Sequence, residues 1–194
     1  MAAITAPRIF PFQPGGAADG TTLPSGRISL VDLTDRPRFK GPGSAAWLTA
    51  AGIPLPSVNR VGTHRGLKVL RLGGEDILLT AEGGDAAFDE IRTAWNPDSA
   101  PKGYSSWREE GWAWMRLSGP ALDPVLARLC ALDLRRGHFG DDEIAQTRFA
   151  GVETVLHRAD DAFALFFDIT ASAFLARAVA ATDKHCAHLP KTGE

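Results

Sequence analysis

The sequence predicts an α+β fold made of two repeated halves, each with the order strand, helix, strand pair, helix. Two stretches have nearly the same pattern, because Phe39-Lys40-Gly41-Pro42 and Leu117-Ser118-Gly119-Pro120 are each followed by a leucine six positions after the proline. Internal similarity of this kind is typical of a duplicated supersecondary unit. Tight turns join the strand pairs, which favours antiparallel pairing. We therefore expect mainly antiparallel sheets with helices on their outer faces.

The first half, residues 27–96, contains three predicted strands and two predicted helices. The strands follow runs of aliphatic and β-branched residues, and they cover residues 28–33, 67–72 and 76–80. The helices are expected to begin after turn or capping residues, and they cover residues 42–51 and 86–95. Asp85 is the expected cap of the second helix, and Pro97 is expected to end it.

The second half, residues 107–183, follows a linker at residues 97–106 that is rich in proline and glycine. Its predicted strands cover residues 112–117, 144–149, 153–157 and 163–169. Its predicted helices cover residues 120–132 and a segment from Thr170 or Ser172 to about residue 181. A polar tail, residues 184–194, closes the chain.

Prolines and glycines interrupt residues 1–26 throughout, so this segment is expected to be an arm and not a continuous helix or strand. Ile9, Phe10 and Phe12 give the arm an apolar part. An apolar arm of this kind is suited to lie on a partner chain, and simple disorder is the alternative.

The composition is that of an ordinary globular protein, with 194 residues of which 44% are hydrophobic and 23% are charged. The formal net charge of −2 gives no reason to expect nucleic acid or an anionic membrane as a partner. No apolar run approaches the length of a membrane helix, and the start of the chain lacks the pattern of a secretory signal. With two cysteines far apart, a cytoplasmic location is the simplest expectation.

Motifs for catalysis or metal binding are weak. The two Gly-Pro turns lack the patterns of phosphate-binding loops. His185-Cys186-Ala187-His188 has metal-ligand residue types without a companion pair at zinc-finger spacing. Cys130 falls on the apolar face of its predicted helix, where a thiol usually packs as an inert group. We therefore expect no catalytic, cofactor-binding or metal-binding residues in this chain.

Three tryptophans gather around one predicted strand of the second half. Trp112 and Trp114 point to the same face of that strand, and Arg116 is close by. Core packing is one interpretation, and a partner interface rich in tryptophan and arginine is the other. The candidate partner-contact residues are Phe10, Phe12, Trp107, Trp112, Trp114 and Arg116.

A series of motifs in the second half follows a specific order. Gly119-Pro120-Ala121 leads through spaced leucines to Cys130-Ala131-Leu132-Asp133-Leu134, then to Phe139 and to Ala145-Gln146-Thr147 before a strand. This order resembles the gamma subunit of heterotetrameric sarcosine oxidase. The closing strand and helix of residues 163–179 fit the same family, and the first half agrees more loosely.

The resemblance implies a non-catalytic subunit in a complex with alpha, beta and delta chains. Gamma chains of this family resemble in fold the folate-binding domain of aminomethyltransferase, the T-protein of glycine cleavage. The resemblance further implies that the complex oxidatively demethylates sarcosine or a related N-methyl amine, with one-carbon transfer to tetrahydrofolate. FAD, FMN, NAD and tetrahydrofolate belong to that complex, and none is expected to bind this chain alone.

The sequence departs from the aminomethyltransferases at one position that matters for chemistry. Those enzymes place an acidic residue just after a glycine-rich turn, whereas the corresponding residues 65–70 here contain no carboxylate. Autonomous folate chemistry is therefore not expected. A stand-alone aminomethyltransferase-like folate-binding protein is the alternative hypothesis, and a structural repeat domain unrelated to amine oxidation is the third.

Overall fold

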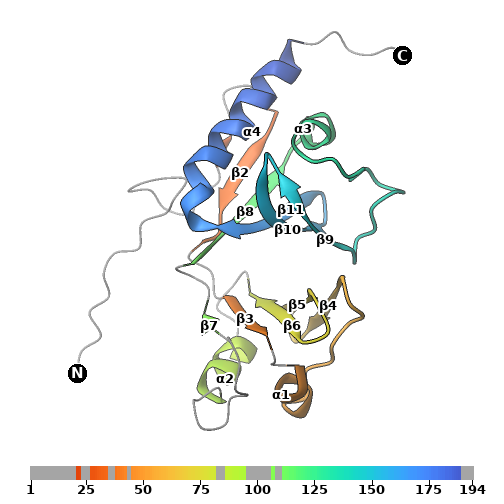
Figure 1. Cartoon of the computed structure of the whole chain (residues 1–194), viewed down its shortest axis with the longest axis vertical. Coiled ribbons are helices and arrows are strands. Elements are labelled where there is room, and N and C mark those ends of the chain that lie inside the picture. Colours follow the sequence, from red (N-terminus) through yellow and green to blue (C-terminus); the bar gives the residue numbers. More distant parts are fainter. Residues whose placement is uncertain are drawn as a thin grey trace, which may run out of the picture.

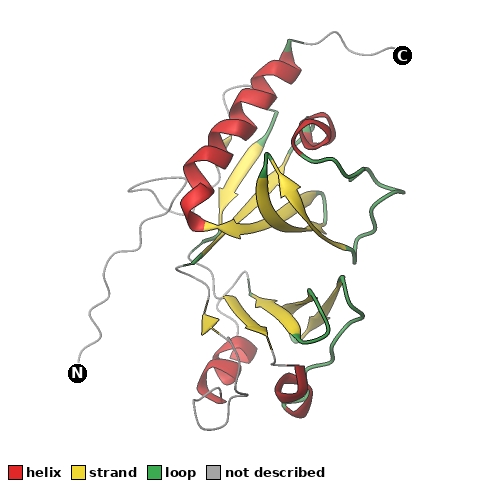
Figure 2. Ribbon diagram, viewed as in Figure 1, coloured by secondary structure: helices red, strands yellow, loops and turns green. Residues whose placement is uncertain are grey.

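Two antiparallel β-sheets face one another, and helices cover the outer side of each sheet (Figures 1 and 2). The computed structural model describes residues 21–22, 27–34, 38–42, 45–81, 86–94, 106–107 and 111–188. Within these ranges the chain forms four layers, in the order helices, larger sheet, smaller sheet, helices (Figure 1).

The larger sheet has the strand order β1-β2-β8-β11-β10-β9 among the described residues. Its strands are β1 (Thr21–Thr22), β2 (Ser29–Asp32), β8 (Trp112–Ser118), β9 (Ile144–Phe149), β10 (Val152–Ala159) and β11 (Ala162–Asp168). Tight turns with left-handed residues join the last three strands: Ala150-Gly151 connects β9 to β10, and Asp160 lies between β10 and β11. Such turns bring β9, β10 and β11 together as an antiparallel meander.

The smaller sheet has the order β4-β5-β6-β3-β7 in the described part of the chain. Its strands are β3 (Arg38–Pro42), β4 (Arg60–His64), β5 (Leu67–Arg71), β6 (Asp76–Thr80) and β7 (Ser106–Trp107). Arg65 and Gly66, both with positive φ, form the turn between β4 and β5.

The helices bury one face each against the outer side of a sheet. They are α1 (Ala45–Ala50), α2 (Ala86–Ala94), α3 (Leu122–Leu129) and α4 (Ser172–Ala187), with a short 3₁₀ turn at Ile169–Ala171. Leu126 of α3 and Val179 of α4 pack with Phe163 on the larger sheet, and Phe88 of α2 packs with Val69 on the smaller sheet. This burial of apolar area is the main force that holds the outer layers in place.

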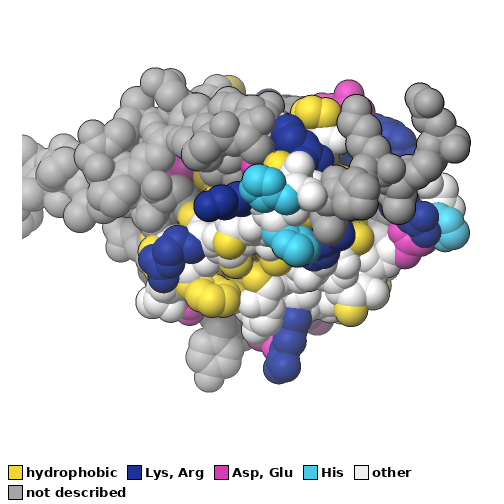
Figure 3. Space-filling view, turned by 90° about the horizontal axis from the view of Figure 1, so that it is seen from above, with side chains coloured by type: hydrophobic (Ala, Val, Ile, Leu, Met, Phe, Trp, Pro, Cys, Tyr) yellow, Lys and Arg dark blue, Asp and Glu magenta, His cyan; other side chains and the backbone are white. Residues whose placement is uncertain are grey.

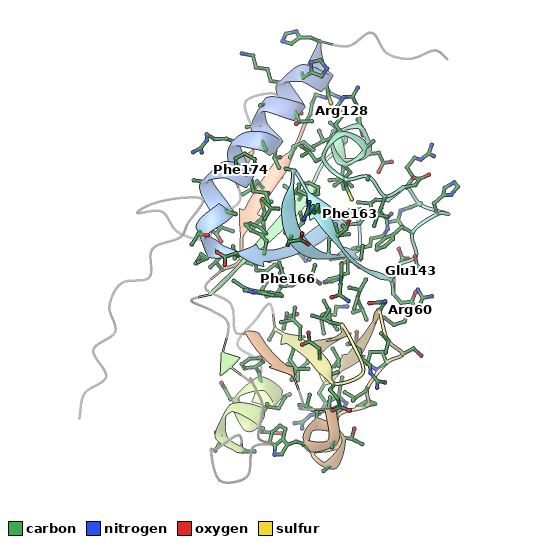
Figure 4. The ribbon with its side chains drawn as sticks, viewed as in Figure 1. Arg60, Arg128, Glu143, Phe163, Phe166 and Phe174 are labelled. Carbon is green, nitrogen blue, oxygen red and sulfur yellow. The ribbon has the colours of Figure 1, made fainter. Side chains whose placement is uncertain are left out.

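A third apolar cluster fills the space between the sheets. Leu70 and Leu78 of the smaller sheet meet Trp114 and Phe166 of the larger sheet there. Successive strand residues point to opposite faces, so Phe163 belongs to the helix side of β11 and Phe166 to the inner side (Figure 4). The two sheets therefore share one interior.

Polar contacts at the β4–β9 edge add to this packing. Gln146 donates from Nε2 to the Leu72 carbonyl at 2.6 Å and to Asn59 Oδ1 at 3.0 Å. Arg60 and Glu143 form an ion pair of 2.7 Å between the sheets (Figure 4). The contacts fix how the smaller sheet sits on the larger one.

The structure confirms several of the predicted elements. The α+β class and the antiparallel sheets are confirmed, and the predicted strands at residues 76–80 and 144–149 match β6 and β9. The prediction that Trp112 and Trp114 share a face is also confirmed, because both pack in the inter-sheet cluster, whereas Ala113 and Met115 lie on the helix side.

Other boundaries differ from the sequence prediction. Pro42 ends strand β3 opposite Asp76 and does not begin a helix, since a strand end tolerates the missing N–H of proline. The helix expected to reach residue 132 ends at Leu129, because Cys130 turns extended and bridges Phe149. The strand β4 was not predicted, since its sequence Arg-Val-Gly-Thr-His has little apolar alternation.

The structure also differs from the prediction at the N-terminal arm, at the first strand and at the end of the last helix. The sequence pattern assigns residues 28–33 to the first half, yet β2 pairs with β8 in the larger sheet. Thr21–Thr22, inside the expected arm, pair with β2. Helix α4 continues to Ala187 and not to residue 181, because Asp183 and Cys186 extend its buried face. The expected cap Asp85 and the helix end at Trp95 and Pro97 lie outside the described residues.

Candidate functional site

A cavity of about 590 Å³ lies between the two sheets. Its buried floor is formed by Thr80, Trp114, His157 and Arg158, beside the half-buried Arg116. Its exposed rim is formed by Lys68, Arg136, Asp141, Asp160 and Asp161. We refer to these residues together as the inter-sheet cleft. Its lining is mostly polar, with cations from both sheets and carboxylates on the rim.

The strand register explains how these side chains meet. Arg116 of β8 pairs with Ala164 of β11, and Ala164 pairs with His157 of β10, so the three lie in one row on one face of the sheet. At the usual spacing between strands, the row places the Cα atoms of Arg116 and His157 about 10 Å apart. Ala164 fills the middle position with a methyl group, which leaves space above it.

The smaller sheet contributes the opposite wall. Lys68 of β5 pairs with Thr80 of β6, so both side chains project from the same face of that sheet. Lys68 lies near His157 across the cleft, since its charge is one of the groups that lower the pKa of that imidazole. The row of Arg116 and His157 on the larger sheet and the pair of Lys68 and Thr80 on the smaller sheet therefore line the same cavity.

His157 is held as a neutral hydrogen-bond acceptor toward the cleft. Its Nδ1 lies 2.8 Å from the Arg158 carbonyl oxygen, which only accepts, so Nδ1 carries the proton and donates. Burial, with the nearby charges of Lys68 and Arg116, lowers the pKa of His157 to about 4, against a weaker opposing effect of the bond to the Arg158 carbonyl. Nε2 then keeps its lone pair at neutral pH.

Thr80 places a buried hydroxyl in the cleft. The residue is 1% exposed, and its Oγ1 has no hydrogen-bond partner among the described residues. Buried polar groups are almost always hydrogen-bonded, since an unmet one costs about 1–3 kcal/mol. This hydroxyl is therefore a candidate contact for a bound molecule.

The rim carries most of its acidic groups in ion pairs. Arg136 lies 2.8 Å from Asp161 and 3.5 Å from Asp141, and Arg158 also lies 3.5 Å from Asp141. Lys68 differs, because its Nζ has a hydroxyl contact to Thr63 at 3.5 Å and no carboxylate partner in the described part of the chain. The cationic character of the cleft is thus least compensated at Lys68.

The lining combines groups of several chemical types. Within the described ranges the cleft contains cations, three rim carboxylates, a neutral imidazole and a hydroxyl. No group of three or more His, Cys, Asp or Glu side chains that could hold a metal occurs in the described residues. Cys130 and Cys186 are buried free thiols, and Cys186 faces the Pro124 carbonyl at 3.7 Å, away from the exposed His185 and His188.

A second cavity, of about 330 Å³, lies toward the other end of the larger sheet. Its lining includes the half-buried Trp112, together with Gln146, Val155 and Asp168. Trp112 is thus an aromatic side chain at a surface opening, which is the position expected of a contact residue.

Of the six predicted partner-contact residues, four lie in the described part of the chain. Phe10 and Phe12 lie outside the described residues, and Trp107 is described by its backbone, in β7 opposite Phe39. Trp112 and Arg116 are half-buried and line the two different cavities. Trp114 is 1% exposed and packs in the inter-sheet cluster, so it serves the core.

The outer face above α3 and α4 is mixed. Figure 3 shows lysine, arginine and histidine side chains gathered there between apolar ones. Phe174 of α4 is 50% exposed and Leu132 is 43% exposed. None of the helices in the described residues is long and apolar enough to cross a membrane.

The sequence did not identify the cleft, because its members come from separate strands and have no shared motif. Thr80 ends a strand, and His157 is one of five scattered histidines. One signal was present: Arg116 stands on the same face as Trp112 and Trp114 in an otherwise apolar strand, which places a charge on an inner face.

Comparisons with known proteins agree with this fold. The chain is 31% identical over 121 residues to "Sarcosine oxidase subunit gamma" from Corynebacterium sp. (strain U-96), a match that covers 61% of this chain and 58% of that relative's length. A solved structure of heterotetrameric sarcosine oxidase from Corynebacterium sp. U-96 in complex with pyrrole 2-carboxylate contains a chain of the same fold. The TM-score is 0.69 at 22% identity, covering 84% of this chain and 87% of that chain. No family model matches the sequence.

Proposed function

Because the chain is 31% identical over 121 residues to a sarcosine oxidase gamma subunit, we propose that it belongs to that family and is the non-catalytic small subunit of a heterotetrameric flavoprotein complex. The observation that carries the proposal is the sequence match, which a fold match over most of both chains supports. The proposed partners are alpha, beta and delta chains. The proposed reaction of the complex is oxidative demethylation of sarcosine or a related N-methyl amine, with one-carbon transfer to tetrahydrofolate.

The chemistry of the cleft supports an assembly role for this chain. Its buried polar residues are Thr80, His157 and Arg158, and its carboxylates, those of Asp141, Asp160 and Asp161, lie on the exposed rim. We infer that FAD, FMN, NAD and tetrahydrofolate are held by the larger chains, which carry the reaction. The location of such a complex is proposed to be the cytoplasm.

The strand order supports a further part of the proposal, that the chain consists of two repeated halves. The order β4-β5-β6-β3 in the smaller sheet corresponds to β9-β10-β11-β8 in the larger one. Along the chain, each set is also arranged as one strand, a helix, three strands and a helix, which is one strand more than the expected strand pair. A duplicated unit accounts for this correspondence, with β1, β2 and β7 as additions at the sheet edges.

The alternative hypothesis, a stand-alone folate-binding protein, has less support. It requires an acidic anchor for the pterin, whereas Lys68 stands on the cleft wall within the segment that should provide it. Asp141 and Asp161 lie on the rim and pair with Arg136. A titration of the purified chain with tetrahydrofolate distinguishes the two hypotheses, since micromolar binding without partners would favour the alternative.

Isolation of the full chain from its native cells tests the subunit proposal. A tagged chain should elute with three further chains in fixed proportion, which mass spectrometry of the eluted peak would identify. Elution of the tagged chain alone at physiological salt would contradict the proposal.

The partner-facing side can be tested with two matched aromatic variants. Trp112→Ala, at the opening of the second cavity, should reduce co-elution, whereas Phe174→Ala on the exposed side of α4 should not. Equal retention of partners by both variants would remove Trp112 from the proposed contact surface.

A further inference from the structure

We propose that the inter-sheet cleft binds the oxyanion group of a small molecule, a carboxylate or a phosphate, between Lys68, Arg116 and Thr80. In this arrangement His157 Nε2 accepts a hydrogen bond from a donor on the same ligand. The inference concerns this chain's own residues and does not depend on the subunit role proposed above.

Charge is the first argument. Lys68 from one sheet and Arg116 from the other line the same cavity, and each acts on the pKa of His157, so both cations face one volume. An anion between them gains charge-assisted hydrogen bonds from both.

The buried hydroxyl is the second argument. Thr80 is nine-tenths or more buried and lines the cavity with an Oγ1 that has no partner among the described residues. It also stands directly across from Lys68 in the β5–β6 pairing. An oxyanion bound by the Lys68 ammonium therefore lies near the Thr80 hydroxyl, which has no other hydrogen-bond partner among the described residues.

His157 requires a hydrogen-bond donor on the ligand. Its Nδ1 donates to the Arg158 carbonyl, so Nε2 accepts, and an oxygen lone pair cannot satisfy it. The preferred ligand therefore carries an O–H or N–H donor beside its anionic group, as hydrogen phosphate or a 2-hydroxycarboxylate does. A simple carboxylate such as acetate lacks that donor.

The size of the cleft fits a small molecule and not a single ion alone. About 590 Å³ lies within the range that usually holds small-molecule ligands. Trp114 and Ala159 contribute apolar lining beside the charged groups. The remainder of a ligand can therefore contact this wall, with its anionic group at Lys68 and Arg116.

The experiment uses the full chain in the form in which it purifies, with or without bound partners. Inorganic phosphate, glycolate and acetate are titrated at low ionic strength, and binding is followed by calorimetry and by the ring resonances of His157. The proposal expects phosphate or glycolate to bind and to shift those resonances, and acetate to bind more weakly. Phosphate binding alone assigns the site to phosphorylated ligands, and glycolate binding alone to hydroxycarboxylates.

Variants decide whether the cleft is the site. Lys68→Met should weaken binding by roughly tenfold or more, because a charge-assisted contact is lost. Thr80→Val should weaken binding while the apo protein stays folded. Lys184→Met, which removes an exposed lysine from α4, is the matched control and should leave affinity unchanged.

Absence of binding by all three probes, or equal losses for Lys68→Met and Lys184→Met, would overturn the proposal. These outcomes are separate from those of the subunit proposal, which is decided by co-eluting chains. A chain that elutes without partners and binds phosphate at Lys68 would contradict only the subunit role.

Discussion

The rings of Trp114 and Phe166 lie 5.2 Å apart between their centroids, tilted by 34° to one another. The two residues are direct cross-strand neighbours on β8 and β11, and both are almost completely buried. They pack with Leu70 and Leu78 of the opposite sheet. This aromatic pair is thus the centre of the contact that joins the two sheets.

Trp114→Ala is expected to lower the free energy of unfolding by about 3–5 kcal/mol, the usual cost of removing a buried tryptophan. Trp112→Ala, on the same strand and face but half-buried, is the control and should cost less than half as much. Chemical denaturation of both variants measures the difference. Equal losses of stability would contradict the assignment of Trp114 to the core.

Gly119→Ala is expected to be strongly destabilising. The residue has a φ of +124°, and a Cβ there would lie 2.3 Å from the Arg27 carbonyl oxygen. Backbone strain and a backbone clash therefore act together. The Gly-Pro turn of the second half thus requires glycine for a close approach of two segments.

Gly137→Ala is the matched control for that substitution. Its φ of +92° is also in the left-handed region, but a Cβ there meets nothing within 4 Å. Only the strain remains, at roughly 1–2 kcal/mol. Thermal unfolding should therefore show a clearly larger decrease in Tm for Gly119→Ala, and equal shifts would contradict the close approach at Arg27.

Stability should depend on pH through His157. Its pKa is lowered to about 4 in the folded protein, against about 6.5 in an unfolded chain, so between these values the unfolded state binds more protons. The contribution of the neutral His157 imidazole to the free energy of unfolding is complete above pH 6.5, and it is lost as the pH falls toward 4. The loss amounts to about 3 kcal/mol.

NMR titration of the His157 ring, together with denaturation of His157→Gln, measures this effect. The wild type should lose more stability than the variant between pH 6.5 and 4, since glutamine does not titrate. A ring that titrates near pH 6.5 in the folded protein would show that the imidazole is not buried as described.

Gln146→Ala is expected to lower the free energy of unfolding by about 1 kcal/mol, because it removes hydrogen bonds from Nε2 to the Leu72 carbonyl and to Asn59. Arg148, two positions along β9, pairs with Glu153 at an exposed site within its own sheet. Arg148→Ala should therefore change the Tm less. A larger effect for Arg148→Ala would argue against the inter-sheet role of Gln146.

Much of the fold could be predicted because its strands carry strong local patterns. The strand Asp76–Thr80 has an aliphatic centre, Ile77-Leu78-Leu79, and follows a Gly-Gly turn, and the strand of Trp112–Ser118 alternates between two faces, so both stand out in the sequence. The strand Arg60–His64 has neither property. It exists because it pairs with β5, and such pairing is a property of the tertiary structure.

The cleft could not be predicted for a related reason. Lys68, Thr80, Arg116 and His157 come from four strands of two sheets, and their proximity depends on register and sheet packing. No local pattern encodes the distance between them. Arg116 stands beside the tryptophans in the sequence, but its place next to a second cation depends on Lys68 in the opposite sheet.

The central proposal, that this chain is a subunit of an amine-oxidising flavoprotein complex, is tested most directly by an absorbance spectrum. The tagged full chain is isolated from its native cells, and the visible spectrum of the eluted peak is recorded before and after sarcosine is added. The proposal predicts a flavin spectrum that bleaches when sarcosine reduces the cofactor. An eluted chain without flavin absorbance, at a yield where the chain itself is readily detected, would contradict it.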